Sequence, residues 1–354
     1  MTALNILALN SGSSSFKFGL YRVDSAGVDK LLGETLSTGT TPAGADAVAR
    51  VVSALAASAM PPPDAIGHRV VHGGPALRQH GRINSAVLRQ LQAASAFAPL
   101  HTPAALALIR SSQVHFPGIP QVACFDTQFH AGLPDVARVL PIARELLSDG
   151  VQRYGFHGLS LESIVRQLGA GLPERLVVAH LGSGASITAL KAGRSIDTSM
   201  GLTPSGGVIM ATRSGDLDPG LLLYLLREKQ FDAAALEALV DHRSGLFGIS
   251  GLSGDMRRLH EAAVSNADAR LAIEMFCMSV RKQVAAMAAV LGGLDMLVFT
   301  GGIGENDAPV RHEICSGLQW LGVSVDASAA RCQVRVLASQ EDEQIARHVW
   351  AALA

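Results

Sequence analysis

The chain has 354 residues and nearly balanced charge, with 29 Lys and Arg against 30 Asp and Glu. Without a basic excess, it is not expected to bind nucleic acid non-specifically. Single hydrophobic cores usually stop growing below this length, so we predict two domains. The four cysteines form no C-x-x-C pair, and neither a signal peptide nor a bilayer-spanning apolar stretch is recognised. We therefore expect a cytoplasmic protein without membrane partners.

The first segment with a chemical signature runs from Ile6 to Phe18, ILALNSGSSSFKF. Apolar runs on both sides of a Gly/Ser/Asn turn predict a β-hairpin. Small turn residues let backbone N–H groups and hydroxyls approach an anion, and Lys17 adds a positive charge. Taken alone, such a motif is more often an ordinary serine-rich hairpin than a phosphate site.

Helical and extended patterns then alternate along the first half. Strands are predicted over 31–41, 65–71 and 122–125, and helices over 45–59, 85–96 and 103–116. The opening pattern returns at Leu176–Lys191, LVVAHLGSGASITALK, where Gly182 takes the place of Gly12. This repetition indicates an internal duplication with one hairpin of this kind in each half.

The second half continues with predicted helices over 219–229, 233–241 and 268–291, and strands at 296–299 and 334–336. Between them, Thr300–Asn306 is predicted to be a glycine-rich turn that leads into a helix near Pro309. A strand, such a turn and a helix N-terminus can bind a nucleotide phosphate or ribose. Glu341, Asp342 and Glu343 open a last helix, where acidic residues favour the N-terminal end.

Four polar residues in turns or at strand ends are candidates for chemistry: Arg69, Asp126, His157 and Arg213. Arg69, His157 and Arg213 are each, taken alone, more often surface or structural residues, and a carboxylate after a buried strand, such as Asp126, is commonly a cap or a metal ligand. Together with the glycine-rich turns they predict phosphoryl transfer, which needs cations and donors around the equatorial oxygens and Mg²⁺ on the nucleotide. No Walker A loop, Rossmann fingerprint or G-x-S-x-G elbow is found. His68 and His72 lie in a predicted strand, roughly 13 Å apart, too far to share a zinc ion.

Nine motifs carry a resemblance to a known family: LALNSGSSSFKF, GHRVVHGG, APLHTP, CFDTQFH, RYGFHG, VVAHLGSGAS, DTSMGLTP, TRSGDLDPG and FTGGIGEN. The chain resembles the acetate and propionate kinase family over essentially its whole length. The resemblance implies an α/β fold of two duplicated ribonuclease-H-like domains, of the actin and sugar-kinase type, with mixed sheets flanked by helices. It implies an N-terminal acyl and phosphoryl-site domain of residues 1–130 plus helix 342–354, a C-terminal nucleotide-binding domain of residues 131–341, and a homodimer.

The implied activity is reversible, Mg²⁺-dependent phosphoryl transfer between ATP and acetate, giving acetyl phosphate and ADP by direct in-line attack of the carboxylate. Mn²⁺ is an alternative ion. The alternative substrates are propionate and other short-chain acids, because one methylene changes binding by only about 1–3 kcal/mol. Other classes considered are a carboxylate-independent ATP or polyphosphate hydrolase, a chaperone ATPase and an inactive dimer. The physiological direction and regulation stay open.

Residue roles follow from the matching motifs. The implied catalytic residues are Arg69, Asp126, His157 and Arg213, and the two arginines hold the carboxylate and phosphoryl oxygens. With Arg69, the substrate pocket is formed by Val71, Leu100, Phe156 and Pro204. Mg²⁺ is held by Asn10 and Glu341. The implied ATP-binding residues are Asn10, Ser13, Ser15, Lys17, His180, Leu181, Gly182, Ser183, Gly184, Asp255, Met256, Arg257, Gly302, Ile303, Gly304, Glu305 and Asn306.

The chain departs from the family pattern at several positions near these motifs. Ser183 and Thr102 stand where the family usually has asparagine, and the loop at 203–207 reads TPSGG. A serine hydroxyl still donates to a phosphate oxygen, but with shorter reach and one donor fewer than an amide. These changes leave the predicted chemistry intact and leave the preferred carboxylate open.

Overall fold

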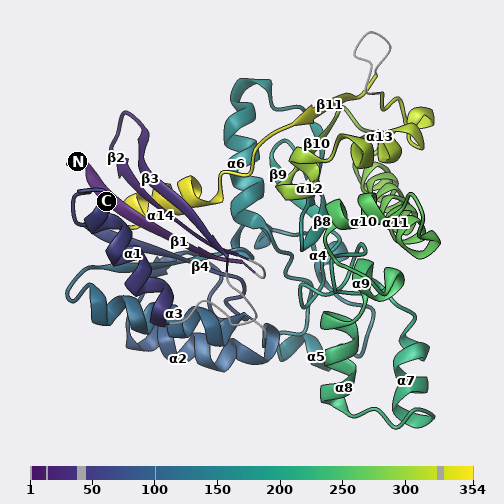
Figure 1. The fold of residues 1–354 in the computed structure, drawn as a ribbon, viewed down its shortest axis with the longest axis horizontal. Coiled ribbons are helices and arrows are strands. Elements are labelled where there is room, and N and C mark those ends of the chain that lie inside the picture. The colour runs from purple at the N-terminus through teal and green to yellow at the C-terminus, as the bar shows by residue number, and fades with distance from the viewer. Residues whose placement is uncertain (1, 13–14, 38–44, 100, 325–330, 354) are drawn as a thin grey trace. The chain divides into compact units, whose positions relative to one another are not determined.

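The structure is a computed structural model that describes residues 2–12, 15–37, 45–99, 101–324 and 331–353 (Figure 1). The chain divides into two compact units. Unit 1 comprises Met1–Ala131, Phe156–Arg166 and Gln340–Ala354, and unit 2 comprises Gly132–Gly155 and Gln167–Ser339. Unit 1 thus contains the segment Phe156–Arg166, which sequence analysis assigns to the C-terminal domain.

Unit 1 is built on a mixed sheet with strand order β3-β2-β1-β4-β6-β5. β1 forms an antiparallel hairpin with β2, β2 pairs antiparallel with β3, and β4 and β6 continue the sheet parallel to β1. The bounds are β1 Leu4–Ser11, β2 Ser15–Val23, β3 Val28–Ser37, β4 Ala65–Val70, β5 Gly81–Arg82 and β6 Gln121–Phe125. The predicted opening hairpin is therefore confirmed.

Helices cover both faces of this sheet. Successive side chains of β1 point to opposite faces, so neighbouring residues pack against different helices. Leu7 and Leu9 pack with α1 (Ala45–Ala57) and α3 (Thr102–His115) on one face. Ile6 and Ala8 pack on the other face with α6 and α14. These two helices span Gly158–Leu168 and Glu341–Leu353. The result is a three-layer α/β/α unit in which the last helix of the chain returns to the first strand (Figure 1).

Unit 2 repeats this design with strand order β11-β10-β7-β8-β9. β7, β8 and β9 are antiparallel neighbours, and β10 and β11 extend the sheet parallel to β7. The bounds are β7 Arg175–Leu181, β8 Ala185–Lys191, β9 Arg194–Thr198, β10 Met296–Thr300 and β11 Gln333–Val336. The long helix α11 (Ala267–Leu291) packs on β7 and β8. Apart from the edge strand β5, which unit 2 lacks among its described residues, the same order and strand directions in both units confirm the predicted duplication and the mixed α/β fold.

The other α-helices are α2 Ser85–Ala93, α4 Asp135–Arg138, α5 Glu145–Ser148, α7 Pro219–Arg227, α8 Ala233–Glu237, α9 Gly245–Ser250, α10 Met256–Ala262, α12 Gly301–Asn306 and α13 Ala308–Ser316. The prediction of a turn at Thr300–Asn306 is wrong, because this segment is mostly the short helix α12. Gly301 begins it with a φ of 79°, and a Cβ there would lie 2.7 Å from the carbonyl oxygen of Leu181. Among the described residues, no helix has the length and apolarity to cross a membrane.

Candidate active site

The carboxyl ends of three neighbouring parallel strands bring polar side chains of unit 1 together. Asn10 lies near the end of β1, Arg69 near the end of β4, and Asp126 directly follows β6. Parallel strands present their carboxyl ends at one edge of a sheet, where α/β proteins commonly bind ligands. Glu341, the first residue of α14, reaches the same edge.

The Arg69 guanidinium connects these side chains. Its Nε lies 3.0 and 3.1 Å from the two carboxylate oxygens of Asp126, and its Nη2 lies 2.7 Å from Oδ2. Its Nη1 donates to Oδ1 of Asn10 at 3.0 Å and lies 3.3 Å from Oε2 of Glu341. Such a planar fork matches carboxylate geometry and holds its partners in defined positions.

Asp342 belongs to the same network, although sequence analysis did not select it as a site residue. The amide nitrogen of Asn10 donates to Glu341 Oε2 at 2.9 Å and to Asp342 Oδ1 at 2.8 Å. Because the Asn10 oxygen accepts from Arg69, the orientation of the amide is determined at both ends. The sequence signal was the acidic run at the start of α14, in which we selected Glu341 as a Mg²⁺ ligand but interpreted Asp342 only as favourable for the helix dipole.

The site is buried and carries more negative than positive charge. Asn10, Asp126 and Glu341 are 3%, 1% and 9% exposed. Burial alone would lower the pKa of Arg69, but the adjacent Asp126 and Glu341 carboxylates raise it above its usual range, so the guanidinium stays charged. Burial raises the pKa of Asp342, against the hydrogen bond from Asn10. This excess of oxygen donors suits a hard divalent cation such as Mg²⁺.

His157 occupies a strained position beside Asp126. Its φ of 59° lies in the left-handed region, and it is 8% exposed directly before α6. The N–H of Gly158 donates to the carbonyl oxygen of Asp126 at 2.9 Å, and a Cβ on Gly158 would lie 2.3 Å from that oxygen. A non-glycine residue in this conformation costs on the order of 1–3 kcal/mol, and such residues cluster at functional sites.

In unit 2, the predicted nucleotide-binding segments lie along one edge of the sheet. Thr300 pairs with His180 in the β10–β7 ladder, so the hairpin at His180–Gly184 adjoins α12, which contains the predicted residues Gly302–Asn306. Asp255 caps α10, and Met256 and Arg257 begin it. Nε2 of His260 on this helix lies 2.9 Å from Oδ2 of Asp307, which directly follows α12. The fold therefore brings all three segments together.

Arg213 is also in unit 2, where it is 7% exposed and donates through Nη1 to the Pro204 carbonyl at 3.1 Å. Its loop adjoins the nucleotide hairpin, since the Ala211 N–H donates to the Ser183 carbonyl at 3.2 Å. The structure thus groups Arg213 and Pro204 with the predicted nucleotide segments.

The remaining predicted residues belong to unit 1. Val71 is half-buried, and Phe156 is buried with its ring centroid 5.5 Å from that of His72. Lys17 is exposed and pairs with Asn10 across the β1–β2 ladder. Ser13 and Leu100 lie outside the described residues, as does the side chain of Ser15.

Comparison with known proteins now decides the family. A sequence profile described as the acetokinase family matches residues 33–349. The chain belongs to this family. It is 40% identical to an acetate kinase of Rhodopseudomonas palustris, across 98% of this chain and 97% of that protein. It is 45% identical to an acetate kinase of Thermosynechococcus vestitus, across 80% of this chain and 72% of that protein.

Two solved structures cover almost the whole chain of this acetokinase-family member. Porphyromonas gingivalis acetate kinase aligns with a TM-score of 0.82 and 32% identity, covering 99% of this chain and 100% of that one. A Francisella tularensis propionate kinase aligns with a TM-score of 0.87 and 35% identity, with the same coverage. The resemblance drawn from the nine sequence motifs is confirmed, and the protein is a phosphotransferase.

Proposed function

We propose that this protein is an acetate kinase that catalyses reversible transfer of the γ-phosphoryl group of ATP to acetate. The observation that carries this proposal is the buried network of Arg69 with Asn10, Asp126 and Glu341 at the strand ends of unit 1. It combines a fixed cation with oxygen ligands for Mg²⁺, the two requirements of phosphoryl transfer to an anionic acceptor. Family membership supports the same reaction.

The nucleophile needs no general base. Carboxylic acids have a pKa near 4, so acetate is ionised at neutral pH and attacks the γ-phosphorus directly. The obstacle is repulsion between this anion and the polyphosphate. In the proposal, Arg69 and Arg213 bind the carboxylate and phosphoryl oxygens and offset that repulsion, and His157 donates a hydrogen bond to the transferring group.

Asp126 acts in this proposal as an orienting acid. Both of its carboxylate oxygens accept hydrogen bonds from the Arg69 guanidinium, which leaves them poorly placed to remove a proton from a substrate. The pairing instead keeps the guanidinium in one plane and directs Nη1 toward Asn10. The reaction requires no proton removal, so an orienting role is sufficient.

Glu341, Asp342 and the Asn10 side chain would hold Mg²⁺. Asp126 and Glu341 pair with a single guanidinium, and Asp342 joins this network through Asn10; the excess of negative charge fits a divalent cation with oxygen ligands. When bound, the ion neutralises charge on the phosphates. Residues of unit 2 at the hairpin, α10 and α12 bind ATP or ADP in this proposal.

The decisive assay supplies protein, ATP and Mg²⁺ with acetate and traps acetyl phosphate with hydroxylamine as the hydroxamate. Hydroxamate that requires acetate supports the proposal, and ADP release without a carboxylate would indicate a hydrolase. Propionate is the second candidate substrate, because a propionate kinase of Francisella tularensis aligns with the chain. Parallel reactions with propionate and butyrate rank the acids by kcat/KM.

Replacing His157 with asparagine should lower kcat by about 10²-fold while the fold is kept. Asparagine tolerates the left-handed conformation better than most residues, so the backbone strain does not increase. The loss reports the missing imidazole donor, since removal of one donor to developing charge costs about 10²–10³ in rate. Steady-state hydroxamate formation measures kcat, and thermal unfolding checks the fold. A kcat near that of the parent protein would exclude the proposed role.

Replacing Asp342 with asparagine should raise the stability of the metal-free protein and weaken its binding of Mg²⁺. A carboxyl with a raised pKa in the folded state opposes folding increasingly as pH rises through that pKa. The variant should therefore unfold at a higher temperature at neutral pH without Mg²⁺. Its half-saturating Mg²⁺ concentration should rise at least about 10-fold, because a carboxylate that would hold the ion is lost.

Glu343→Gln is the matched control for Asp342. It lies next on α14 but pairs with Arg166 and Arg347 instead of Asn10. This variant should keep the parental Mg²⁺ requirement. An equal rise of that requirement in both variants would show that α14 responds as a whole and would contradict a specific role for Asp342.

A homodimer is the proposed assembly, and α7 is its proposed contact surface. None of the residues of α7 is buried, although the sequence of this helix, PGLLLYLLR, is mostly apolar. Leu223 and Tyr224 are 49% and 48% exposed. A second copy could cover this surface, which no described element buries. Light scattering should give twice the chain mass for the parent and the chain mass for Leu223→Glu; an unchanged mass in that variant would exclude α7.

A further inference from the structure

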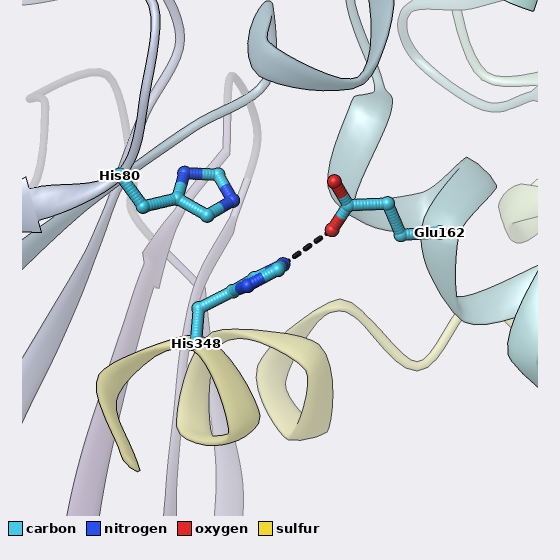
Figure 2. A group of neighbouring side chains, drawn as sticks. All are labelled: His80, Glu162 and His348. Carbon is cyan, nitrogen blue, oxygen red and sulfur yellow. Dashed lines mark hydrogen bonds and ion pairs between the residues drawn. The ribbon is translucent and has the colours of Figure 1, made fainter. Parts of the chain in front are cut away.

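Three side chains of unit 1 that the proposed reaction does not use converge on one point. His80 comes from the turn before β5, Glu162 from α6 and His348 from α14. One potential ligand atom of each lies within 4.8 Å of the others. Figure 2 shows the two rings and the carboxylate facing one another, with His348 hydrogen-bonded to Glu162. Among the described residues, this is the one group of three His, Cys, Asp or Glu side chains with such geometry.

The hydrogen bonding of His80 favours a ligand at this point. Its Nδ1 accepts a hydrogen bond from the N–H of Phe125 at 3.0 Å. Its Nε2 is buried and has no hydrogen-bond partner among the described residues. A buried polar atom without a partner calls for an explanation, and an ion is one.

We propose that His80, Glu162 and His348 form a binding site for a transition-metal ion of the Zn²⁺ class, separate from the Mg²⁺ site of the reaction. The ligands are Nε2 of each histidine and a carboxylate oxygen of Glu162. Two imidazoles and one carboxylate are a ligand set that zinc uses, with a water completing the tetrahedron. Mg²⁺ prefers oxygen ligands alone, so ligand chemistry separates this site from the one at Asn10 and Glu341.

Binding requires a redistribution of protons. Because Nδ1 of His80 accepts from Phe125, the metal-free neutral ring carries its proton on Nε2. In the metal-bound form that proton resides on Nδ1, and the hydrogen bond from Phe125 is lost. The proton that Nε2 of His348 donates to Glu162 likewise moves to Nδ1 of His348, so that Nε2 is free to bind the ion. Losing one buried hydrogen bond lowers affinity by about 5- to 100-fold. Structural zinc sites bind with a Kd of about 10⁻⁷ M or tighter, so we expect a Kd near 10⁻⁶ M, which weakens at acidic pH.

The bound ion would join three segments of unit 1. α6 directly follows His157, and α14 begins with Glu341, so the ion would stabilise the two helices next to these proposed site residues. Gln344 lies at the same point, with its amide nitrogen 3.1 Å from Nε2 of His348. Metal binding at Nε2 of His348 would therefore displace the Gln344 amide from this contact. Because an ion that binds only the folded state stabilises it, the melting temperature should rise with metal concentration.

The test titrates the full chain with Zn²⁺ alone in calorimetry and with Co²⁺ in visible absorption, both with excess Mg²⁺ to occupy oxygen-ligand sites. The parent should bind one equivalent, and Co²⁺ should give the strong absorption of a tetrahedral site. His348→Gln and Glu162→Gln should each weaken binding at least tenfold. His312→Gln, which removes an exposed histidine on α13, should bind as the parent does.

The proposal is overturned if the parent binds no ion under these conditions, or if His348→Gln and Glu162→Gln bind Zn²⁺ like the parent. His80→Gln provides a third variant, in which the half-buried imidazole is replaced by a side chain without a ring. Circular dichroism identifies any variant that does not fold. The Zn²⁺ affinities of the folded variants then test the proposal. The readouts are binding and melting temperature, so they do not depend on the kinase assay.

Discussion

Replacing Arg213 with alanine should lower kcat by about 10³- to 10⁵-fold with a modest change in stability. An arginine aimed at a transferring phosphoryl group contributes a rate factor of this size. Its side chain is buried and donates to the Pro204 carbonyl. Removing it leaves that carbonyl without this donor, which costs on the order of 1–3 kcal/mol. Steady-state kinetics and thermal unfolding measure the two quantities.

Arg175→Ala is the matched control for Arg213, because both residues belong to unit 2. Arg175 begins β7 and pairs with Asp295 on a partly exposed surface. Because Arg175 has no role in the proposed reaction, its removal should leave kcat within about twofold of the parent value. The lost ion pair should cost at most about 1 kcal/mol of stability, as for other exposed pairs. If Arg213→Ala turns over acetate as fast as this control, the proposed role of Arg213 is wrong.

Replacing Arg69 with alanine should reduce kcat by at least 10³-fold and also destabilise unit 1. The loss of turnover follows from the implied role of Arg69, and its contacts add a loss of stability. Arg69 is the cation that pairs with Asp126 and Glu341, and the Asp126 carboxylate is 1% exposed. Removing one partner of a buried ion pair costs about 3–5 kcal/mol, because the other charge stays buried and unpaired. Denaturant unfolding measures this loss, and Mg²⁺ should recover part of it.

The double variant Arg69→Leu with Asp126→Asn separates the two effects. It removes the cation together with the carboxylate that it neutralises most closely, so much of the lost stability should return. Activity should stay low because the cation is still missing. If the double variant recovers turnover along with stability, Arg69 serves the fold and not the reaction.

Local sequence patterns were sufficient to predict the main architecture. The hairpin at Ile6–Phe18 and its repetition at Leu176–Lys191 are each formed by apolar runs around a glycine and serine turn. Such a pattern determines local pairing, because residues close in sequence lose little entropy on meeting. The two sheets share the order of five strands, which confirms the duplication that this repetition indicated. Helices with clear apolar periodicity, such as Ala267–Leu291, were also predicted.

Glycine-rich and short segments were harder to predict, since their conformation depends on neighbours. Gly301–Asn306 reads as a turn, yet it forms α12 because Gly301 fits against the Leu181 backbone and Glu305 accepts from its N–H. The short helices α4 and α5 have too few residues for a periodic signal. Tertiary contacts overrule weak local preferences at such positions.

The sequence by itself determined the family, the duplicated fold and the candidate residues, because these are written in local motifs. Only the tertiary structure decided which of these residues are in contact. Asp342 joins Asn10 although the two are separated by most of the chain, and His80, Glu162 and His348 come from three distant segments. No periodicity connects such residues. Their contacts arise when α14 and α6 pack on the first sheet, where burial and charge then fix what each side chain can do.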